Sequence, residues 1–124
     1  MKLEINGIHL ELEEDLKKYV TKKLNKLEKY VPRHARESAD ANVMLKESHA
    51  KNKRQFTCEI TLKLPHETIN VSESTLNIFA AVDIAEATLK NRLKKYKEKK
   101  VSERSGGKDR KVRELLGKML SKKS

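Results

Sequence analysis

The amino-acid sequence predicts an α+β domain of order β-α-β-β-β-α, with two helices packed on one face of a four-stranded, mostly antiparallel sheet. Two long segments, residues 13–30 and 77–100, carry apolar side chains every three or four positions, which is the spacing of an amphipathic helix. Residues 55–64 alternate between apolar and polar side chains, which is typical of a strand with one buried face. Because each helix has one apolar stripe and the sheet has one apolar face, both helices are expected on that face.

Length and charge indicate one basic domain followed by a basic tail. The chain has 124 residues, of which 38% are charged and 36% are hydrophobic, so its core must be modest. Residues 1–100, the predicted domain, contain 21 Lys and Arg against 15 Asp and Glu, and residues 101–124, the predicted tail, contain 8 against 3. Since both parts contribute to the net charge of +11, we expect a polyanionic partner such as a nucleic acid.

The first strand and the first helix are expected within residues 2–30. Residues 2–6 alternate as a short strand, and the helix begins at the acidic residues 13–15, which suit the positive end of its dipole. Pro32 ends this helix near Tyr30. Its inner face is expected to contain Leu16, Val20, Leu24 and Leu27, with Tyr19 and Tyr30 at the edge. Another face is almost purely cationic, which an anionic partner explains better than solvation alone, and it consists of Lys18, Lys22, Lys26 and Lys29.

Three more strands and a second helix complete the predicted domain. Residues 33–39 are expected to be a loop, residues 41–46 the second strand, residues 55–64 the third, and a short fourth strand contains Ile69 and Val71. The core stripe of the second helix is expected to be Phe79, Val82, Ala85, Leu89, Leu93 and Tyr96. Its last third is rich in bases, namely Lys90, Arg92, Lys94, Lys95, Lys97, Lys99 and Lys100. Side by side, the two helices should present one basic platform.

The tail has two features of its own. Residues 102–108 contain Gly106-Gly107 and are expected to be a flexible linker. Residues 108–120 place four apolar side chains at helical spacing, but the segment is short and contains Gly117, which argues against a helix that is stable alone. We therefore expect a mobile basic tail that becomes ordered only on a partner.

Residues for catalysis or metal binding are not grouped in the sequence. The four histidines are scattered, and Cys58 falls on the apolar side of its strand, where a buried small side chain is expected rather than a nucleophile. Asp83 and Glu86 lie three residues apart on the second helix and are interpreted as a surface pair that offsets nearby lysines. With no phosphate loop and no dinucleotide fingerprint, the sequence predicts no enzyme, cofactor, metal or small-molecule substrate.

The sequence also predicts no membrane segment and no signal peptide. No run of about 18 apolar residues exists, and charges stand in the N-terminal stretch where a signal peptide needs apolar residues. A cytoplasmic protein is therefore expected. Cys58 is the only cysteine, so no intramolecular disulfide is expected.

The aromatic residues argue against binding through base stacking. All five are predicted on or beside core faces, whereas the exposed strand positions hold Thr, Glu, Gln and Lys. Recognition of structured RNA by shape and phosphate contacts is therefore favoured. The predicted RNA-binding residues are Lys18, Lys22, Lys23, Lys26, Lys29, Lys90, Arg92, Lys94, Lys95, Lys97 and Lys99.

Two segments carry a resemblance to a known family. Residues 5–30 (INGIHLELEEDLKKYVTKKLNKLEKY) hold a strand, a glycine and a lysine-rich helix, and residues 77–83 read Asn-Ile-Phe-Ala-Ala-Val-Asp at the start of NIFAAVDIAEATLKNRLKKYKEKK. On these segments, and over residues 2–100 in all, the chain resembles the bacterial ribosome hibernation promoting factors and ribosome-associated inhibitors. The signature of that family is Asp-Met-Tyr-Ala-Ala-Ile-Asp.

The resemblance implies a fold like a double-stranded-RNA-binding domain and a site on the small ribosomal subunit, between head and body, where mRNA and tRNAs would sit. Thr88 and Asn91 stand where the family often has Lys and Arg. The family's long form has a further C-terminal domain that pairs ribosomes, and residues 101–124 are too few to build it, so a short form is expected, monomeric off the ribosome. The resemblance implies ribosomal-RNA contacts from Lys22, Lys23, Lys26, Lys29, Lys95 and Lys97.

Two other functions stay open at this point. A general module that binds structured RNA, without a ribosomal role, would have the same basic helices. An enzyme or a regulator of another protein is a third hypothesis, for which the sequence offers no residues. Co-sedimentation with ribosomes, competed by free duplex RNA, distinguishes the first two.

Overall fold

The computed structural model describes residues 1–104, apart from the side chains of residue 50 and residues 99–104. The predicted order of strands and long helices is confirmed. The elements are β1 (Lys2–Ile8), α1 (Glu14–Leu27), the 3-10 turn η1 (Glu28–Tyr30), α2 (Arg33–Arg36), β2 (Asp40–Ala50), β3 (Lys53–Leu64), β4 (Glu67–Thr75) and α3 (Ile78–Arg104).

Several boundaries differ from the sequence prediction. The second strand, expected at residues 41–46, extends to residue 50. The expected loop at residues 33–39 contains the short helix α2, and the expected short fourth strand is nine residues long. Helix α3 continues past residue 100, so residues 102–104, predicted as linker, are helical. The remainder of the predicted tail, including Gly106-Gly107 and the apolar positions after it, lies outside the described residues, and the division at residue 100 stays a prediction.

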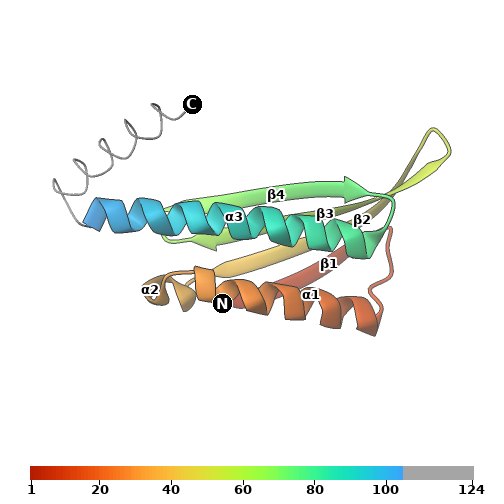
Figure 1. The fold of residues 1–124 in the computed structure, drawn as a ribbon. Coiled ribbons are helices and arrows are strands. Elements are labelled where there is room, and N and C mark those ends of the chain that lie inside the picture. Colours follow the sequence, from red (N-terminus) through yellow and green to blue (C-terminus); the bar gives the residue numbers. More distant parts are fainter. Residues whose placement is uncertain (105–124) are drawn as a thin grey trace, which may run out of the picture.

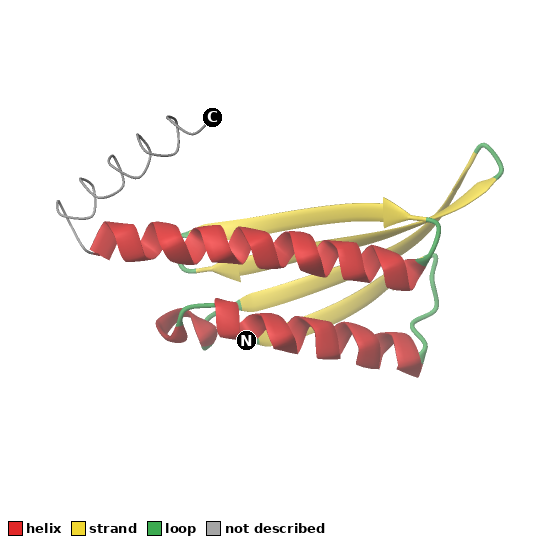
Figure 2. Ribbon diagram, viewed as in Figure 1, coloured by secondary structure: helices red, strands yellow, loops and turns green. Residues whose placement is uncertain are grey.

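The four strands form one sheet in the order β1-β2-β3-β4. Strand β1 pairs with β2 in parallel, whereas the other two pairs are antiparallel, as the prediction of a mostly antiparallel sheet requires. The register places Ile5 beside Val43, Val43 beside Ile60, and Ile60 beside Val71, so one apolar row crosses all four strands. Figure 2 shows both long helices on the same side of this sheet, which confirms the predicted layers.

The long helices α1 and α3 lie side by side and run in the same direction (Figure 1). Tyr19 of α1 contacts Phe79 of α3, and Lys23, one turn later, contacts Asp83, also one turn later. The contacts therefore advance together along both helices. As a result, the C-terminal end of α1 lies beside the middle of α3.

The core lies between the sheet and the two helices, at the positions that the apolar stripes predict. In α1 the buried residues are Leu16, Val20, Leu24 and Leu27. In α3 they include Val82, Ala85, Leu89, Leu93 and Tyr96. Cys58 is buried on the inner face of β3, as predicted.

Phe79 is a correction to the predicted core stripe. Its side chain is 40% exposed, whereas Ala81, which the stripe omitted, is fully buried. At 3.6 residues per turn, position 79 lies about 120° around the helix from Ala85, which turns it toward α1 instead of toward the sheet. There its ring meets Tyr19 edge-on, with ring centroids 5.1 Å apart.

Gly7 permits the turn between β1 and the segment that leads into α1. A Cβ atom at this position would lie 2.5 Å from the carbonyl oxygen of Leu10 and 3.2 Å from Cγ of Leu12. The first contact is with backbone and cannot be relieved by a side-chain rotation. The absence of a side chain at Gly7 therefore lets the chain fold back closely enough to start α1 where it covers the sheet.

Candidate nucleic-acid interface

The outer face of α1 is an exposed row of lysines. Because the inner positions of α1 are buried against the sheet, the predicted cationic ridge faces solvent, and its members Lys18, Lys22, Lys26 and Lys29 are all exposed. From residue 18 to residue 29 this row is about 16 Å long at 1.5 Å per residue. A row of that length can meet several phosphates of one RNA backbone.

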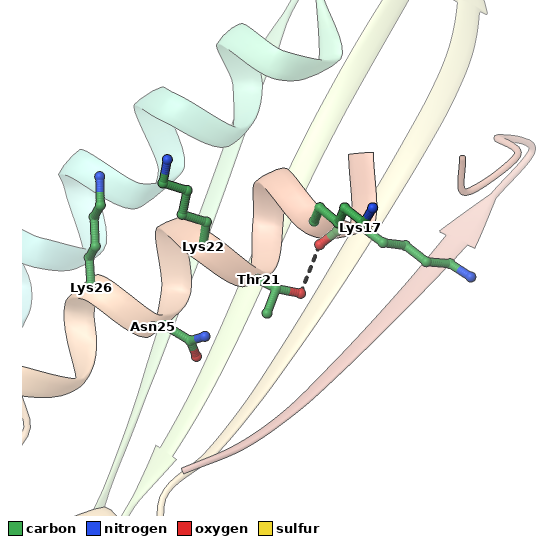
Figure 3. Close-up of a pocket in the computed structure, with 6 residues that line it drawn as sticks. Lys17, Thr21, Lys22, Asn25 and Lys26 are labelled. Atoms are coloured by element: carbon green, nitrogen blue, oxygen red, sulfur yellow. Dashed lines mark hydrogen bonds between the residues drawn. The ribbon is translucent and has the colours of Figure 1, made fainter. Parts of the chain in front are cut away.

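An open hollow of about 600 Å³ follows the same face of α1. Figure 3 shows Lys22 and Lys26 extending in one direction, while Lys17 extends away from them. The hydroxyl of Thr21 donates a hydrogen bond of 2.7 Å to the carbonyl oxygen of Lys17, so Thr21 turns its polar atom toward the helix backbone. Lys17, a residue that the sequence prediction had not selected, also lines this hollow but points away from the row of lysines.

Lys23 lies between the two helices and is paired with acids. Its Nζ atom is 3.3 Å from Oδ1 of Asp83 and 3.9 Å from Oε2 of Glu86, and it lies 5.5 Å from the ring centroid of Tyr19. Asp83 also accepts a hydrogen bond from the Tyr19 hydroxyl. The interpretation of Asp83 and Glu86 as a pair that offsets lysines is therefore confirmed, and the charge of Lys23 is largely offset in the free protein.

The same carboxylate raises two pKa values at this contact. The hydrogen bond to Asp83 raises the pKa of the Tyr19 phenol above its ordinary value, with burial adding to the effect. The interaction with Asp83 also raises the pKa of the Lys23 ammonium. Both groups therefore keep their protons more tightly in the folded protein, which extends this contact between α1 and α3 to higher pH.

Three other lysines converge on one tyrosine ring at the end of α1. The Nζ atoms of Lys29, Lys90 and Lys94 lie 5.3, 5.5 and 5.7 Å from the ring centroid of Tyr30. We call these four residues the Tyr30 cluster. Burial alone would raise the pKa of the Tyr30 phenol, but the interaction with Lys90 and the charges of Lys29 and Lys94 outweigh burial, so this pKa is lowered.

The cations of α3 do not all face the same way. Arg92 lies on the flank of α3 that faces β4, where its Nη1 atom donates a hydrogen bond of 2.7 Å to the carbonyl oxygen of Asn70. Lys95 lies on this flank too, and both residues line a hollow of about 250 Å³ with Tyr96 and residues 67–69. The expectation that all these bases form one platform is therefore wrong for Arg92 and Lys95.

The remaining predicted residues of α3 fall into two groups. Lys90 is half-buried and Lys94 exposed, and both belong to the Tyr30 cluster. Lys97 is exposed one turn after Lys94, whereas the side chain of Lys99 lies outside the described residues. Tyr30 itself was predicted only as the edge of a core stripe, and a contact with a second helix 60 residues later leaves no local signal in the sequence.

No group of His, Cys, Asp and Glu side chains within residues 1–104 could hold a metal ion. In that part of the chain, no helix is both long enough and apolar enough to cross a membrane. The Cys58 thiol is buried, and burial, with a smaller effect of the Glu59 carboxylate, raises its pKa to about 12. A thiol with that pKa is a poor nucleophile at neutral pH.

Comparison with known proteins shows the family to which this chain belongs. The family model described as Sigma 54 modulation protein / S30EA ribosomal protein matches residues 3–101. A ribosome hibernation promotion factor of Deinococcus radiodurans is 29% identical over 105 residues, covering 84% of this chain but 53% of that protein. The chain therefore spans about half the length of that relative. A ribosome hibernation promoting factor of Pseudomonas putida is 30% identical over 102 residues, covering 82% of this chain and 92% of that protein.

Solved structures agree with these sequence matches. The N-terminal domain of Thermus thermophilus Protein Y superposes with a TM-score of 0.65 at 28% identity, covering 77% of this chain and 99% of that domain. A ribosomal subunit interface protein from Coxiella burnetii has a TM-score of 0.64 at 20% identity, with 79% and 99% covered, and at that identity the likeness concerns the fold alone.

Proposed function

Because the chain belongs to the Sigma 54 modulation protein / S30EA ribosomal protein family, we propose that it is a ribosome hibernation factor that silences translation from the small ribosomal subunit. In this proposal the lysines of α1 and the Tyr30 cluster face ribosomal RNA in the channel that mRNA and tRNAs otherwise occupy. A protein held there excludes both ligands by occupancy alone. Family membership supports the prediction of a non-enzymatic, cytoplasmic protein.

One observation carries the proposal, namely the uncompensated row of cations on the outer face of α1. Among the side chains that the structure describes, no ion pair with a carboxylate involves Lys18, Lys22, Lys26 or Lys29. Stacked like charges are unfavourable along a free helix, and an RNA backbone removes this cost by supplying phosphates. The open face of the sheet, in contrast, mixes bases, acids and neutral polar residues, so it lacks such a single-signed surface.

The mechanism that follows is electrostatic docking without base readout. The outer face of α1 presents the ammonium groups of Lys18, Lys22 and Lys26, and no aromatic residue lines the hollow there. Such a surface suits contacts with the phosphates and sugar edges of structured RNA. Such binding releases counterions, so the association constant must fall steeply with salt. Reversal by salt or by a competing ligand would let the subunit return to translation.

The experiment that tests this proposal compares two triple variants in binding to purified small ribosomal subunits. Neutralising Lys22, Lys26 and Lys29 to Gln should weaken binding and reduce the slope of log K against log salt by about two to three, if each lysine meets one phosphate. The matched control changes Lys2, Lys53 and Lys63 to Gln, which removes the same charge from exposed positions away from both long helices. Equal effects of the two triples would mean that only net charge matters, and would refute the proposed docking face.

Competition with free duplex RNA distinguishes the general RNA-binding alternative. A ribosome hibernation factor should stay bound to small subunits in the presence of an excess of duplex RNA of unrelated sequence. If such RNA displaces the protein in proportion to its phosphate concentration, the chain is a general structured-RNA-binding module. Translation in a purified system, which should fall only when the wild-type α1 face is present, gives a second readout.

A further inference from the structure

We propose that Tyr30 is a positioning residue that gathers Lys29, Lys90 and Lys94 into a binding site for a single phosphate group of RNA, at the junction of α1 and α3. This inference deepens the proposed function and rests on it for the identity of the polymer. It concerns a local site that shares only Lys29 with the lysine row of α1. The ligand class is a phosphate oxyanion that accepts hydrogen bonds from ammonium groups.

The three ammonium groups of the cluster converge on one ring. They come from two elements that are far apart in sequence, yet all lie within 5.7 Å of one ring centroid. Three like charges repel one another, so their convergence needs an attractive centre. The electron-rich π-system of the Tyr30 ring supplies one.

No acid among the described side chains neutralises this cluster. Among those side chains, the carboxylate ion pairs of the helix layer are those of Glu28 with the N-terminus and of Lys23 with Asp83 and Glu86. Lys29, Lys90 and Lys94 take part in none of them. A phosphate could therefore approach these ammonium groups without displacing an internal partner, which is not true of Lys23.

The backbone below the cluster is held in place by Arg36. Arg36 of α2 donates hydrogen bonds from Nε to the carbonyl oxygens of Glu28 and Val31, at 3.1 and 3.0 Å. Its guanidinium also reaches the carbonyl oxygen of Lys29 at 3.4 Å. Arg36 thus holds both sides of the turn that carries Lys29 and Tyr30. With the backbone held and the ring half-buried, the lysines lose less freedom when a phosphate binds.

The test uses inorganic phosphate on the full chain, so it needs no ribosome. Lysine side-chain NMR signals are followed during titration, with chloride added at equal ionic strength as the reference. We expect Lys29, Lys90 and Lys94 to report one common saturable transition. Lys2 and Lys63, which lie on the open face of the sheet, serve as internal controls and should change little. Three cluster lysines that respond no more than Lys63 would overturn the inference.

Two substitutions separate positioning from folding. Tyr30→Leu removes the aromatic face and should weaken the common phosphate transition by about three- to tenfold, whereas Tyr30→Phe keeps that face and should stay within about threefold of wild type. A folded Tyr30→Leu variant with unchanged phosphate affinity would overturn the positioning role. If Tyr30→Leu does not fold, Lys94→Met is used in its place. It should weaken the NMR response of Lys29 and Lys90 to phosphate. An unchanged response would again overturn the inference.

Small-subunit binding by the same variants separates this inference from the proposed function. A wild-type chain that shows the phosphate transition but does not bind small subunits would refute the proposed function and leave the phosphate site supported. A chain that binds small subunits without any phosphate transition at the cluster would refute only the inference about Tyr30.

Discussion

Phe79→Ala tests whether the side chain at position 79 belongs to the core or to the contact between helices. A fully buried Phe→Ala change costs about 3–5 kcal/mol, which is a large share of a small domain's stability. Phe79 is 40% exposed, so only a little more than half of the free energy gained by burying a whole Phe side chain is lost in this substitution. No closed cavity should form at a site open to solvent, which places the expected cost at about 1–2 kcal/mol, including the edge-on pair with Tyr19.

The matched control is Leu89→Ala, in the same helix. Leu89 is fully buried, and removal of its side chain leaves a cavity between α3 and the sheet, so about 3–4 kcal/mol is expected. Urea unfolding followed by circular dichroism measures both free energies of unfolding, provided that the slope with denaturant is unchanged. The structure therefore predicts that Phe79→Ala costs about half as much as Leu89→Ala, or less.

A cost of Phe79→Ala that equals or exceeds the cost of Leu89→Ala would refute this reasoning. If Phe79→Ala destabilised the domain as much as Leu89→Ala, the ring would have to be buried in solution, as the apolar stripe in the sequence suggested. A stable Phe79→Ala variant that fails to bind small subunits would give a different result, because Phe79 would then be a contact residue of the interface.

Three further predictions concern folding and titration. Gly7→Ala should destabilise the domain by about 1–3 kcal/mol in urea unfolding, because the added Cβ atom would lie 2.5 Å from the Leu10 carbonyl oxygen. A loss of stability no larger than that of an ordinary surface substitution would contradict the tight turn. Cys58, with its pKa raised to about 12, should not react with a thiol reagent at pH 8 until the protein unfolds, and rapid labelling of the native protein would show that the strand is accessible. Stability should fall as the pH rises above about 9 to 10, the ordinary pKa values of a thiol and a phenol, because the folded state raises the pKa values of Cys58, Tyr19 and Lys23 and loses their contribution on deprotonation. Tyr19→Phe should reduce that fall in pH-dependent thermal melts, and an identical pH profile for the variant would exclude the contact with Asp83 as its source.

Periodic patterns in the sequence were sufficient to predict the elements and most of the core. One side of α1 is buried along its whole length, so the buried residues recur at helical spacing. These residues are Leu16, Val20, Leu24 and Leu27. The alternation of residues 55–64 predicts the inner face of β3 for the same reason. Local periodicity is a physical consequence of one-sided burial. It can therefore be recognised in the sequence without knowing which elements pack against the helix or strand.

The flanks of the helices could not be predicted in this way. Both Phe79 and Arg92 lie beside the buried stripe of α3, and only the neighbouring elements decide what they meet. Because α1 runs parallel to α3 on one flank and β4 lies on the other, Phe79 contacts Tyr19 while Arg92 reaches the carbonyl oxygen of Asn70. The sequence shows that Arg92 is basic, but not that its guanidinium is already occupied by the edge of the sheet.

The two lysine environments between α1 and α3 differ in what an RNA phosphate would have to displace. Lys23 is held by Asp83 and Glu86, so a phosphate contact there must first break two ion pairs. The Tyr30 cluster is held by a ring face, which attracts cations without accepting their hydrogen bonds strongly and leaves them free to bind an oxyanion. Its position at the C-terminal end of α1 lowers the repulsion among its charges further, because the negative end of the helix dipole lies there. The same three charges can thus be stable in the free protein and ready for a phosphate, whereas Lys23 is better suited to holding the helices together.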